Sequence, residues 1–361
     1  MKKISMILVF ALCVSLLAGC AGTPVVYYTN CTCPAIDDVA PAAPVATEPS
    51  APTAEGVLKT GLSIVANIGD SKSAAADAEG EAKYDVTMVA VLVDDKGVIQ
   101  HCIIDGISTS VKFDNAGAIT SDLTAPVRTK NELGENYGMV KYGGAVAEWD
   151  AQAAALADYA VGKTVEELRS GAIDETGYAP EGTDLATSAT IYLGGYVGAI
   201  EKAVANAKHL GAEAGHTLKL ASVNEVSGSK NAAADAEGLA QLYTTATALT
   251  MNGDVITSCY LDSVQGKGNF DATGVITTDL TAPVQTKNEL GDSYGMVAYG
   301  GAIADWHEQA ASFASYITGK TAAEVTGIAV DETTKTTDAD LLSSVTIKIG
   351  GFQQLIEKAA Q

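Results

Sequence analysis

The residues best suited to chemistry lie in two similar segments near the ends of the two halves of the chain. Asp184 is followed six residues later by Thr190, and Asp340 is followed six residues later by Thr346. Small and hydroxyl residues lie between them, and a Gly-Gly step and an apolar, helix-forming segment come next. A threonine hydroxyl at such a turn could form an ester with a phosphate group. The N-terminus of the following helix would present free N–H groups and a positive dipole end to that phosphate.

The same residues also have a purely structural explanation. Asp and Thr are both favoured as caps ahead of helices. Residues Ile191–Leu193 could form a last buried strand, and the closing helices are expected at Tyr196–Lys208 and Phe352–Ala360. At the level of sequence the chemical and the structural explanations both remain open.

The segments Thr183-Asp-Leu-Ala-Thr-Ser-Ala-Thr190 and Asp338-Ala-Asp-Leu-Leu-Ser-Ser-Val-Thr346 resemble a motif of the FMN-binding domain family of bacterial surface and respiratory flavoproteins. In that family the motif is Asp-x-x-Ser/Thr-Gly-Ala-Thr, and a flavin transferase esterifies the phosphate of FMN onto its threonine. The family's glycine is Ser188 in the first segment and Ser344 in the second, and its alanine is Val345 in the second. Serine adopts positive φ less readily than glycine, so the turn differs from the family's at this point.

The resemblance implies FMN as the cofactor, carried by a redox protein rather than by an autonomous enzyme. A flavin transferase would attach it, and a membrane oxidoreductase would exchange electrons with it. The alternative is a non-redox surface module that keeps the fold and binds another ligand. The implied cofactor-binding residues are Asp184, Ser188, Thr190, Asp340, Ser344 and Thr346.

An internal repeat organises the chain. The run Asp122–Gly134 recurs as Asp279–Gly291 with a single difference, and further matches hold the same register almost to the C-terminus. The period is far too long for a solenoid, so we interpret the chain as two copies of one domain, at 55–209 and 210–361. A domain of about 150 residues buries roughly 70% of its unfolded surface, so each copy is long enough to fold.

Strands are expected at the start of each half. Tyr84–Val93 is rich in β-branched residues and apolar at odd and even positions alike, which favours a central strand. The turn signals Asp95-Lys-Gly97 and Asn252-Gly253 predict hairpins after the central strands. The other expected strands are Val98–Ile104, Ile107–Phe113, Ala118–Thr120 and Val255–Leu261.

Helices are expected to follow the strands. One helical stripe contains Val146, Trp149, Ala153, Leu156 and Tyr159, and a second contains Ile303, Trp306, Ala310, Phe313 and Ile317. Gly162 and Gly319 suit the left-handed position that ends such helices. Thr164 and Thr321, each with a glutamate three residues on, are capping boxes for the next helix. The predicted fold class is α+β, with two duplicated domains that each pack a twisted, mainly antiparallel sheet against helices.

Other chemistry fits the sequence poorly. The triplet Gly162-Lys-Thr164 lacks the upstream glycine of a phosphate-binding loop, because Ala157 stands there. Cys102 and Cys259 occupy equivalent apolar strand positions, where buried cysteine acts as a small hydrophobe. The four histidines have no equivalents between the halves and show no spacing typical of a catalytic triad or metal site.

Aromatic residues recur in both halves and could line a flavin site. Trp149 and Trp306 lie on the apolar helical stripes, so we assign them to the core. The remaining repeated aromatics lie in glycine-containing, loop-like segments, where the backbone could approach a ligand: Tyr137, Tyr142, Tyr294 and Tyr299.

Residues 1–20 resemble a bacterial lipoprotein signal. The positive Lys2-Lys3 precedes an apolar stretch that is too short to span a bilayer comfortably. The stretch ends in Leu17-Ala18-Gly19-Cys20, where small residues precede a cysteine whose thiol can be acylated. A plain secretory signal with an incidental cysteine is the alternative. We expect lipid chains on Cys20 to anchor the protein at the extracytoplasmic face of the cell membrane.

The linker and the charge balance complete this picture. Residues 21–54 are rich in proline and alanine and should hold the folded part away from the membrane. The chain has 22 basic and 44 acidic residues, which give a net charge of −22 at pH 7. Nucleic acid would repel such a polyanion, so we do not expect it as a partner. Apolar residues make up 47% of the chain, which is typical of a globular protein.

Overall fold

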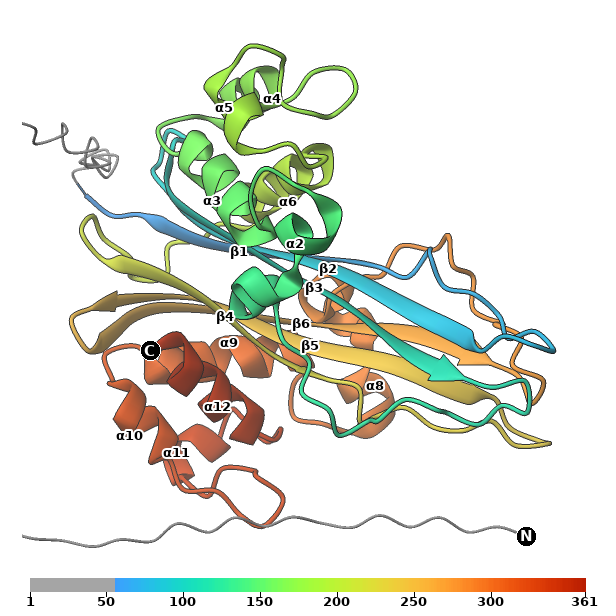
Figure 1. Ribbon diagram of the computed structural model, residues 1–361. Coiled ribbons are helices and arrows are strands. Elements are labelled where there is room, and N and C mark those ends of the chain that lie inside the picture. The colour runs from blue at the N-terminus through green and yellow to red at the C-terminus, as the bar shows by residue number, and fades with distance from the viewer. Residues whose placement is uncertain (1–55) are drawn as a thin grey trace, which may run out of the picture. The chain divides into compact units, whose positions relative to one another are not determined.

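The computed structural model describes residues 56–361, which belong to one compact unit. The expectations for the signal at 1–20, for Cys20 and for the linker at 21–54 lie outside the described residues. The fold is α+β, as predicted: two three-stranded antiparallel sheets are each followed by a set of helices (Figure 1). We call residues 56–209 the first half and residues 210–361 the second half.

The two halves have their elements in the same order. The first half contains β1 (Lys59–Asn67), β2 (Gly80–Val93), β3 (Ile99–Phe113), α1 (Lys130–Leu133), η1 (Gly134–Tyr137), α2 (Met139–Gly143), α3 (Trp149–Ala160), α4 (Val165–Ala172), α5 (Asp184–Ser188) and α6 (Gly194–Ala205). The second half contains β4 (Thr217–Glu225), β5 (Gly238–Asn252), β6 (Val255–Phe270), α7 (Lys287–Leu290), η2 (Gly291–Tyr294), α8 (Met296–Gly300), α9 (Trp306–Ile317), α10 (Ala322–Thr326), α11 (Ala339–Leu342) and α12 (Gly350–Ala359).

The secondary structure stacks in four layers, with the two sheets between two layers of helices (Figure 1). Helices α3 and α6 pack on the outer face of the first sheet, and α9 and α12 pack on that of the second. The inner faces of the two sheets meet in one shared apolar core. Each sheet is therefore buried on both faces.

This double burial explains the apolar run in the central strand β2. Its even-numbered residues from Ala82 to Leu92 face the core shared by the sheets, whereas Val89, Val91 and Val93 face the helices. Successive side chains of a strand point to opposite faces, so a strand covered on both sides needs apolar residues at odd and even positions. The prediction of a central strand at Tyr84–Val93 is confirmed.

The prediction that the return strand breaks near residue 105 is wrong. Strand β3 pairs with β2 without interruption between Cys102 and Phe113. Asp105 and Gly106 suggest a break, but Gly106 pairs with Thr87 and Asp105 is buried. The Asp105 carboxylate accepts hydrogen bonds from the N–H groups of Gly106 (2.7 Å) and of Asn131 in α1 (3.1 Å). A helix distant in sequence thus satisfies a polar side chain inside the strand.

Three smaller expectations are also corrected. Residues 118–120 contribute an isolated bridge between Phe113 and Ile119 instead of a strand. The outer strands β1 and β4 did not emerge from the sequence. Val146 and Ile303 are exposed, because α3 and α9 begin three residues after them.

The local helix signals are confirmed. Thr164 and Thr321 form capping boxes with Glu167 and Glu324, and Gly162 and Gly319 adopt positive φ. The closing helices begin at the Gly-Gly steps, two residues earlier than expected.

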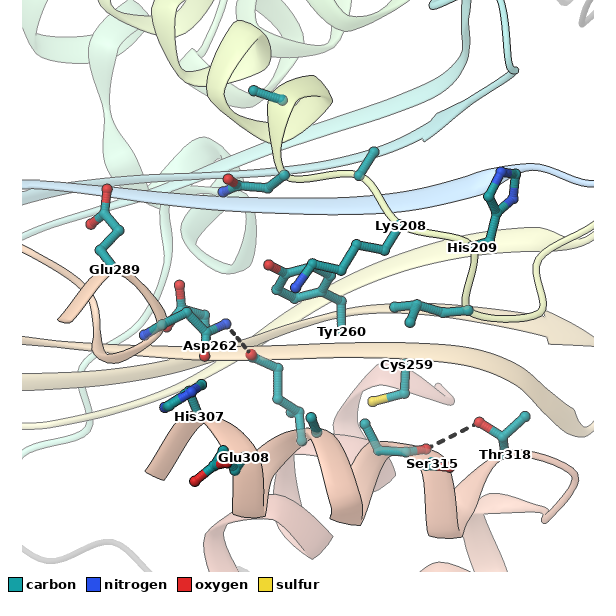
Figure 2. A pocket seen from close by; sticks show the side chains of 18 residues that line it. Lys208, His209, Cys259, Tyr260, Asp262, Glu289, His307, Glu308, Ser315 and Thr318 are labelled. Atoms are coloured by element: carbon teal, nitrogen blue, oxygen red, sulfur yellow. Dashed lines mark hydrogen bonds between the residues drawn. The ribbon is translucent and has the colours of Figure 1, made fainter. Parts of the chain in front are cut away.

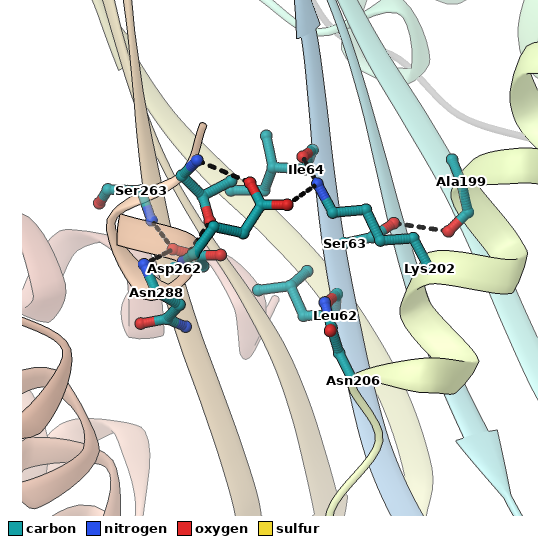
Figure 3. A network of polar contacts seen from close by, with 11 residues as sticks. Leu62, Ser63, Ile64, Ala199, Lys202, Asn206, Asp262, Ser263 and Asn288 are labelled. Atoms are coloured by element: carbon teal, nitrogen blue, oxygen red, sulfur yellow. Dashed lines mark hydrogen bonds and ion pairs between the residues drawn. The ribbon is translucent and has the colours of Figure 1, made fainter. Parts of the chain in front are cut away.

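Reciprocal contacts join the two halves. Lys202 of α6 forms a salt bridge with Glu289 (2.8 Å) and donates a hydrogen bond to the Ile64 carbonyl (3.0 Å), as Figure 3 shows. The equivalent Lys358 of α12 forms a salt bridge with Glu132 of the first half. The backbone repeats the pattern, since Ala74 N–H donates to Gly274 and Ala232 N–H donates to Gly117, both at 2.8 Å. Equivalent surfaces therefore face each other about an approximate two-fold axis, as in an isologous dimer.

The side chains of Phe113 and Phe270 pack against each other at one end of this interface. Their rings stack with centroids 4.0 Å apart and planes 3° from parallel, and neither side chain is exposed. Each ring also covers a glycine of its own sheet, Gly80 or Gly238, where an added Cβ would lie less than 2.5 Å from the ring. The stacked pair leaves no space at these positions for a larger residue.

Candidate functional site

A buried glutamine holds each of the two threonines singled out in the sequence. Gln152 of α3 is fully buried, and its Oε1 accepts hydrogen bonds from the backbone N–H of Thr190 (2.8 Å) and of Ile191 (3.2 Å). The Thr190 hydroxyl lies 3.3 Å from the same oxygen. The glutamine Nε2 donates to the Ala147 carbonyl at 2.8 Å, which fixes the orientation of the amide.

The second half repeats this arrangement atom for atom. Gln309 of α9 accepts from the backbone N–H of Thr346 (2.7 Å) and of Ile347 (3.1 Å), and the Thr346 hydroxyl lies 3.3 Å away. Its Nε2 donates to the Ala304 carbonyl at 2.8 Å. We call each set of contacts the glutamine clamp. These glutamines were not expected from the sequence, although both interrupt an apolar helical stripe at equivalent positions.

The clamped threonines are accessible from solvent. Thr190 is exposed and Thr346 is half-buried, whereas the preceding Ala189 and Val345 are buried. The buried neighbour anchors the turn, and the clamp fixes the backbone on the other side. Each threonine residue is therefore reachable from solvent on a constrained backbone.

The structural explanation of the threonines as helix caps is wrong. The N-cap residues of α6 and α12 are Leu193 and Ile349, and neither forms a side-chain capping bond. Residues 191–193 do not form a strand either. Caps do occur one step earlier in the chain, where Thr183 caps α5 and Asp338 caps α11. The open space beside Gly195 and Gly351, where an added Cβ would meet nothing within 4 Å, leaves the starts of the closing helices approachable.

The structure does not join the two aspartates to their threonines. Asp184 and Asp340 lie in the first turns of α5 and α11, and both are exposed. Among residues 56–361, no hydrogen bond links either carboxylate to Thr190 or Thr346. A short helix thus separates each aspartate from its threonine, which the sequence analysis did not foresee.

The serines at the glycine position of the motif each donate a hydrogen bond to the adjacent short helix: Ser188 is the last residue of α5, and Ser344 follows α11. Ser188 donates to the Asp184 carbonyl and Ser344 to the Leu341 carbonyl, both at 3.3 Å. Neither serine has positive φ. Serine is therefore compatible with the turn in both halves.

A cavity of about 510 Å³ opens beside the second clamp. It is lined by Ile347, Gly351 at the start of α12, and an aromatic group that includes Tyr243, Tyr294, Trp306 and Phe352. Trp306 is 4% exposed, which agrees with its assignment to the core, although its ring also faces this cavity. Tyr299 is not one of the lining residues and is 92% exposed.

A lysine that the sequence analysis overlooked lies inside this aromatic group. Lys287 is only 6% exposed, and its Nζ donates to the Tyr243 hydroxyl at 2.9 Å. The same Nζ lies between 4.7 and 4.9 Å from the ring centroids of Tyr243, Tyr294 and Trp306. Its place in the repeated segment Thr286-Lys-Asn-Glu-Leu290 was the available signal.

The equivalent lysine of the first half has a different environment. Lys130 lies over the rings of Tyr137 (5.2 Å) and Trp149 (4.8 Å). Burial lowers its pKa, and the negative charges of Asp85 and Asp105 oppose that effect. The Trp149 Nε1 donates to the Tyr196 hydroxyl at 2.9 Å, a bond that Phe352 cannot accept in the second half.

A larger cavity, of about 910 Å³, lies between the segment at 205–210 and the second half (Figure 2). Its lining is mixed and includes Lys208, His209, Tyr260, Asp262, Glu289 and His307. Asp262 accepts from the N–H groups of Ser263 (2.7 Å) and Asn288 (3.1 Å), yet burial raises its pKa to about 6. The carboxylate thus binds an N–H in the first turn of α7, whose N-cap residue is Thr286.

We expect Asp262→Asn to change how stability depends on pH. A folded pKa of about 6 against an ordinary 3.8 means that ionisation costs stability as pH rises through this window. A shift of this size corresponds to about 3 kcal/mol at 1.36 kcal/mol per pKa unit. Relative to wild type, the variant should gain up to that amount between pH 4 and pH 7, measured by urea denaturation.

Asp271→Asn is the control with the opposite sign. Hydrogen bonds from Thr273 and Val275 lower the pKa of the exposed Asp271, so its contribution is lost as pH falls. This variant should lose stability relative to wild type as pH rises. Two variants with the same pH dependence would contradict the assignment.

Neither of the two cysteines in residues 56–361 has the surroundings of a reactive thiol. Cys259 is buried, and burial raises the pKa of its thiol to about 12. Burial likewise raises the pKa of Cys102, and the charge of Asp158 adds to the effect. A thiol that stays protonated at neutral pH is a poor nucleophile and metal ligand.

In the part of the chain that the structure describes, no helix is both long and apolar enough to cross a membrane. Comparison of the chain with protein-family models, with curated proteins and with solved structures finds no match. The geometry of the clamped threonines and of the cavities is therefore what bears on function.

Proposed function

We propose that the chain is an extracytoplasmic electron carrier with FMN joined through its phosphate to Thr190 and Thr346. The observation that carries the proposal is the glutamine clamp, which appears with the same atoms in both halves. A clamp bonded mainly to backbone N–H groups survives esterification, because the hydroxyl contributes only its longest contact.

The residues around the second clamp fit a flavin. The start of α12 offers backbone N–H groups and its positive dipole end to a phosphate. The adjacent 510 Å³ cavity is within the usual range for a small-molecule site, and its aromatic lining suits a planar ring system. When bound, the flavin would supply one- and two-electron redox chemistry. The chain's own residues would hold the phosphate end, orient the ring and limit its exposure to water.

Other parts of the proposal extend the resemblance to an FMN-binding family. We treat the two halves as copies of one domain, each with one flavin. We place the mature protein at the cell membrane, held through lipid on Cys20, with a flavin transferase and a membrane oxidoreductase as partners. Two flavins on one tethered chain would let electrons move without diffusion of free cofactor.

The proposal is tested by locating the flavin. The full-length protein is isolated from cells that contain the flavin transferase and is then denatured and separated on a gel. We expect flavin fluorescence in the wild type, loss of one site in Thr190→Ala or Thr346→Ala, and complete loss in the double variant. Peptide mass spectrometry should show the added FMN phosphate at each threonine. Unmodified peptides at both positions would overturn the proposal.

The 910 Å³ cavity favours a second candidate function, a non-redox surface module that binds a small polar ligand. Its lining combines cationic, anionic and hydroxyl side chains (Figure 2). This candidate predicts a colourless protein from its native host and a ligand that dissociates on denaturation. Native mass spectrometry of the isolated protein, compared with the denatured chain, distinguishes it from covalent flavin.

A further inference from the structure

The two clamps share one framework but differ in the charges around them. Each has a lysine, a tryptophan and a tyrosine at equivalent places: Lys130, Trp149 and Tyr137 in the first half, and Lys287, Trp306 and Tyr294 in the second. Lys130 is half-buried, whereas Lys287 is buried. The differences lie on the strand and on the loop that face these groups.

In the first half, carboxylates compensate the positive charge of Lys130. Asp85 acts on Lys130 and also forms a salt bridge with Lys83 (3.3 Å), which in turn bonds Asp70 (3.1 Å). The exposed Tyr192 follows the first clamp, and its ring lies against Gly177 and Gly194. With Asp105, which also acts on Lys130, three carboxylates face the two lysines, so this site has no excess of positive charge.

The second half has lost this compensation. Tyr243 stands at the position of Asp85, and Lys287 forms no salt bridge among residues 56–361. Lys348 replaces Tyr192 and lines the cavity together with Lys287. Glu225 is the carboxylate of the cavity lining. Among the residues that line this cavity, two lysines therefore face one glutamate.

We propose that the second half is the electron-accepting end of the chain, because Lys287 and Lys348 stabilise the negative charge that a flavin on Thr346 gains on reduction. The inference rests on the proposed function. A charge near a cofactor's ring tunes its electronics, and a cation acts more strongly from a partly desolvated position than from water. With both sites loaded, an electron pair given up at Thr190 would be taken up at Thr346, and protons would be exchanged with water at both sites.

The test compares full-length proteins that carry one flavin each. Thr346→Ala keeps the first site and Thr190→Ala keeps the second, and mass spectrometry verifies the modification before each spectroelectrochemical titration. We expect the second site to have the higher midpoint potential. A tenfold preference corresponds to about 30 mV for a two-electron couple, and we expect at least that shift.

Exchanging the compensating residue should shift each potential in a defined direction. With flavin at Thr346, Tyr243→Asp introduces the carboxylate of the first half and should lower the potential. With flavin at Thr190, Asp85→Asn removes it and should raise the potential. Lys348→Tyr, at an exposed position, should also lower the potential of the second site without affecting folding.

Asn252→Asp is the matched control. It adds the same charge as Tyr243→Asp to the same strand, nine residues and about 30 Å away at 3.3 Å per residue, so the potential should stay unchanged. Loaded sites of equal or reversed potential would overturn this inference while the proposed function stands. A control as effective as Tyr243→Asp would overturn it too. Proteins without flavin at either threonine would overturn both.

Discussion

Replacing Phe113 with alanine is expected to lower the free energy of unfolding by about 3–5 kcal/mol, the usual cost of deleting a buried aromatic ring. Phe113 is fully buried, stacks on Phe270 with centroids 4.0 Å apart, and covers Gly80. The deletion leaves a cavity in the core that both sheets share, where rigid strands on each side limit relaxation. Because domains are stable by about 5–15 kcal/mol, the loss is a large fraction of the total.

Urea denaturation of the full-length protein measures this effect. The approximate two-fold relation between the halves predicts a similar loss for Phe270→Ala. The double variant should lose less than the sum, because the two rings contact each other. Tyr299→Ala is the control at a 92% exposed aromatic residue and should change stability by no more than about 0.5 kcal/mol. A loss at Phe113 as small as that of the control would contradict the shared core.

The second large effect concerns the glutamine clamp. We expect Gln309→Ala to abolish flavin at Thr346 while leaving flavin at Thr190 intact. The variant removes the acceptor for the N–H groups of Thr346 and Ile347 and the donor to the Ala304 carbonyl. Without these bonds the hydroxyl loses its fixed position. Unsatisfied buried groups cost about 1–3 kcal/mol each, so stability should fall by roughly 2–4 kcal/mol.

Each half serves as the internal control for the other. Gln152→Ala should abolish modification at Thr190 alone, and peptide mass spectrometry reads both sites in one sample. A thermal unfolding curve of each variant verifies that modification is measured at a temperature well below the transition, where the variant is folded. Equal modification of both sites in folded Gln309→Ala protein would show that the clamp does not position the threonine.

The elements that the sequence predicted well depend on contacts between near neighbours. A capping box joins residues three apart, and a left-handed glycine after a helix is a property of one residue. The central strand was evident because Tyr84–Val93 has apolar residues at odd and at even positions. A strand that is buried on both faces shows this pattern in its own sequence, so no other copy is needed to recognise it.

The errors concern residues whose partners lie far along the chain. Asp105 suggested a strand break because its acceptor role for Asn131, 26 residues away, has no local signal. Gln152 went unnoticed for the same reason, since Thr190 lies 38 residues beyond it. The short helices α5 and α11 separate each aspartate from its threonine. They were not predicted because they are too short to show a recognisable helical period.

By itself, the sequence determined the α+β class, the repeat register, the central strands and the two threonines worth testing. Tertiary structure alone decided which polar groups are buried and with which partners they pair. It closed the glutamine clamps, gathered three aromatic rings around Lys287 and brought Asp85 close enough for its charge to act on Lys130. The physical reason is that the burial and pairing of polar side chains depend on their positions in three dimensions, which the order of residues along the chain does not show directly. The effect of having Asp85 in one half and Tyr243 in the other can be inferred only from the positions of these residues in the fold.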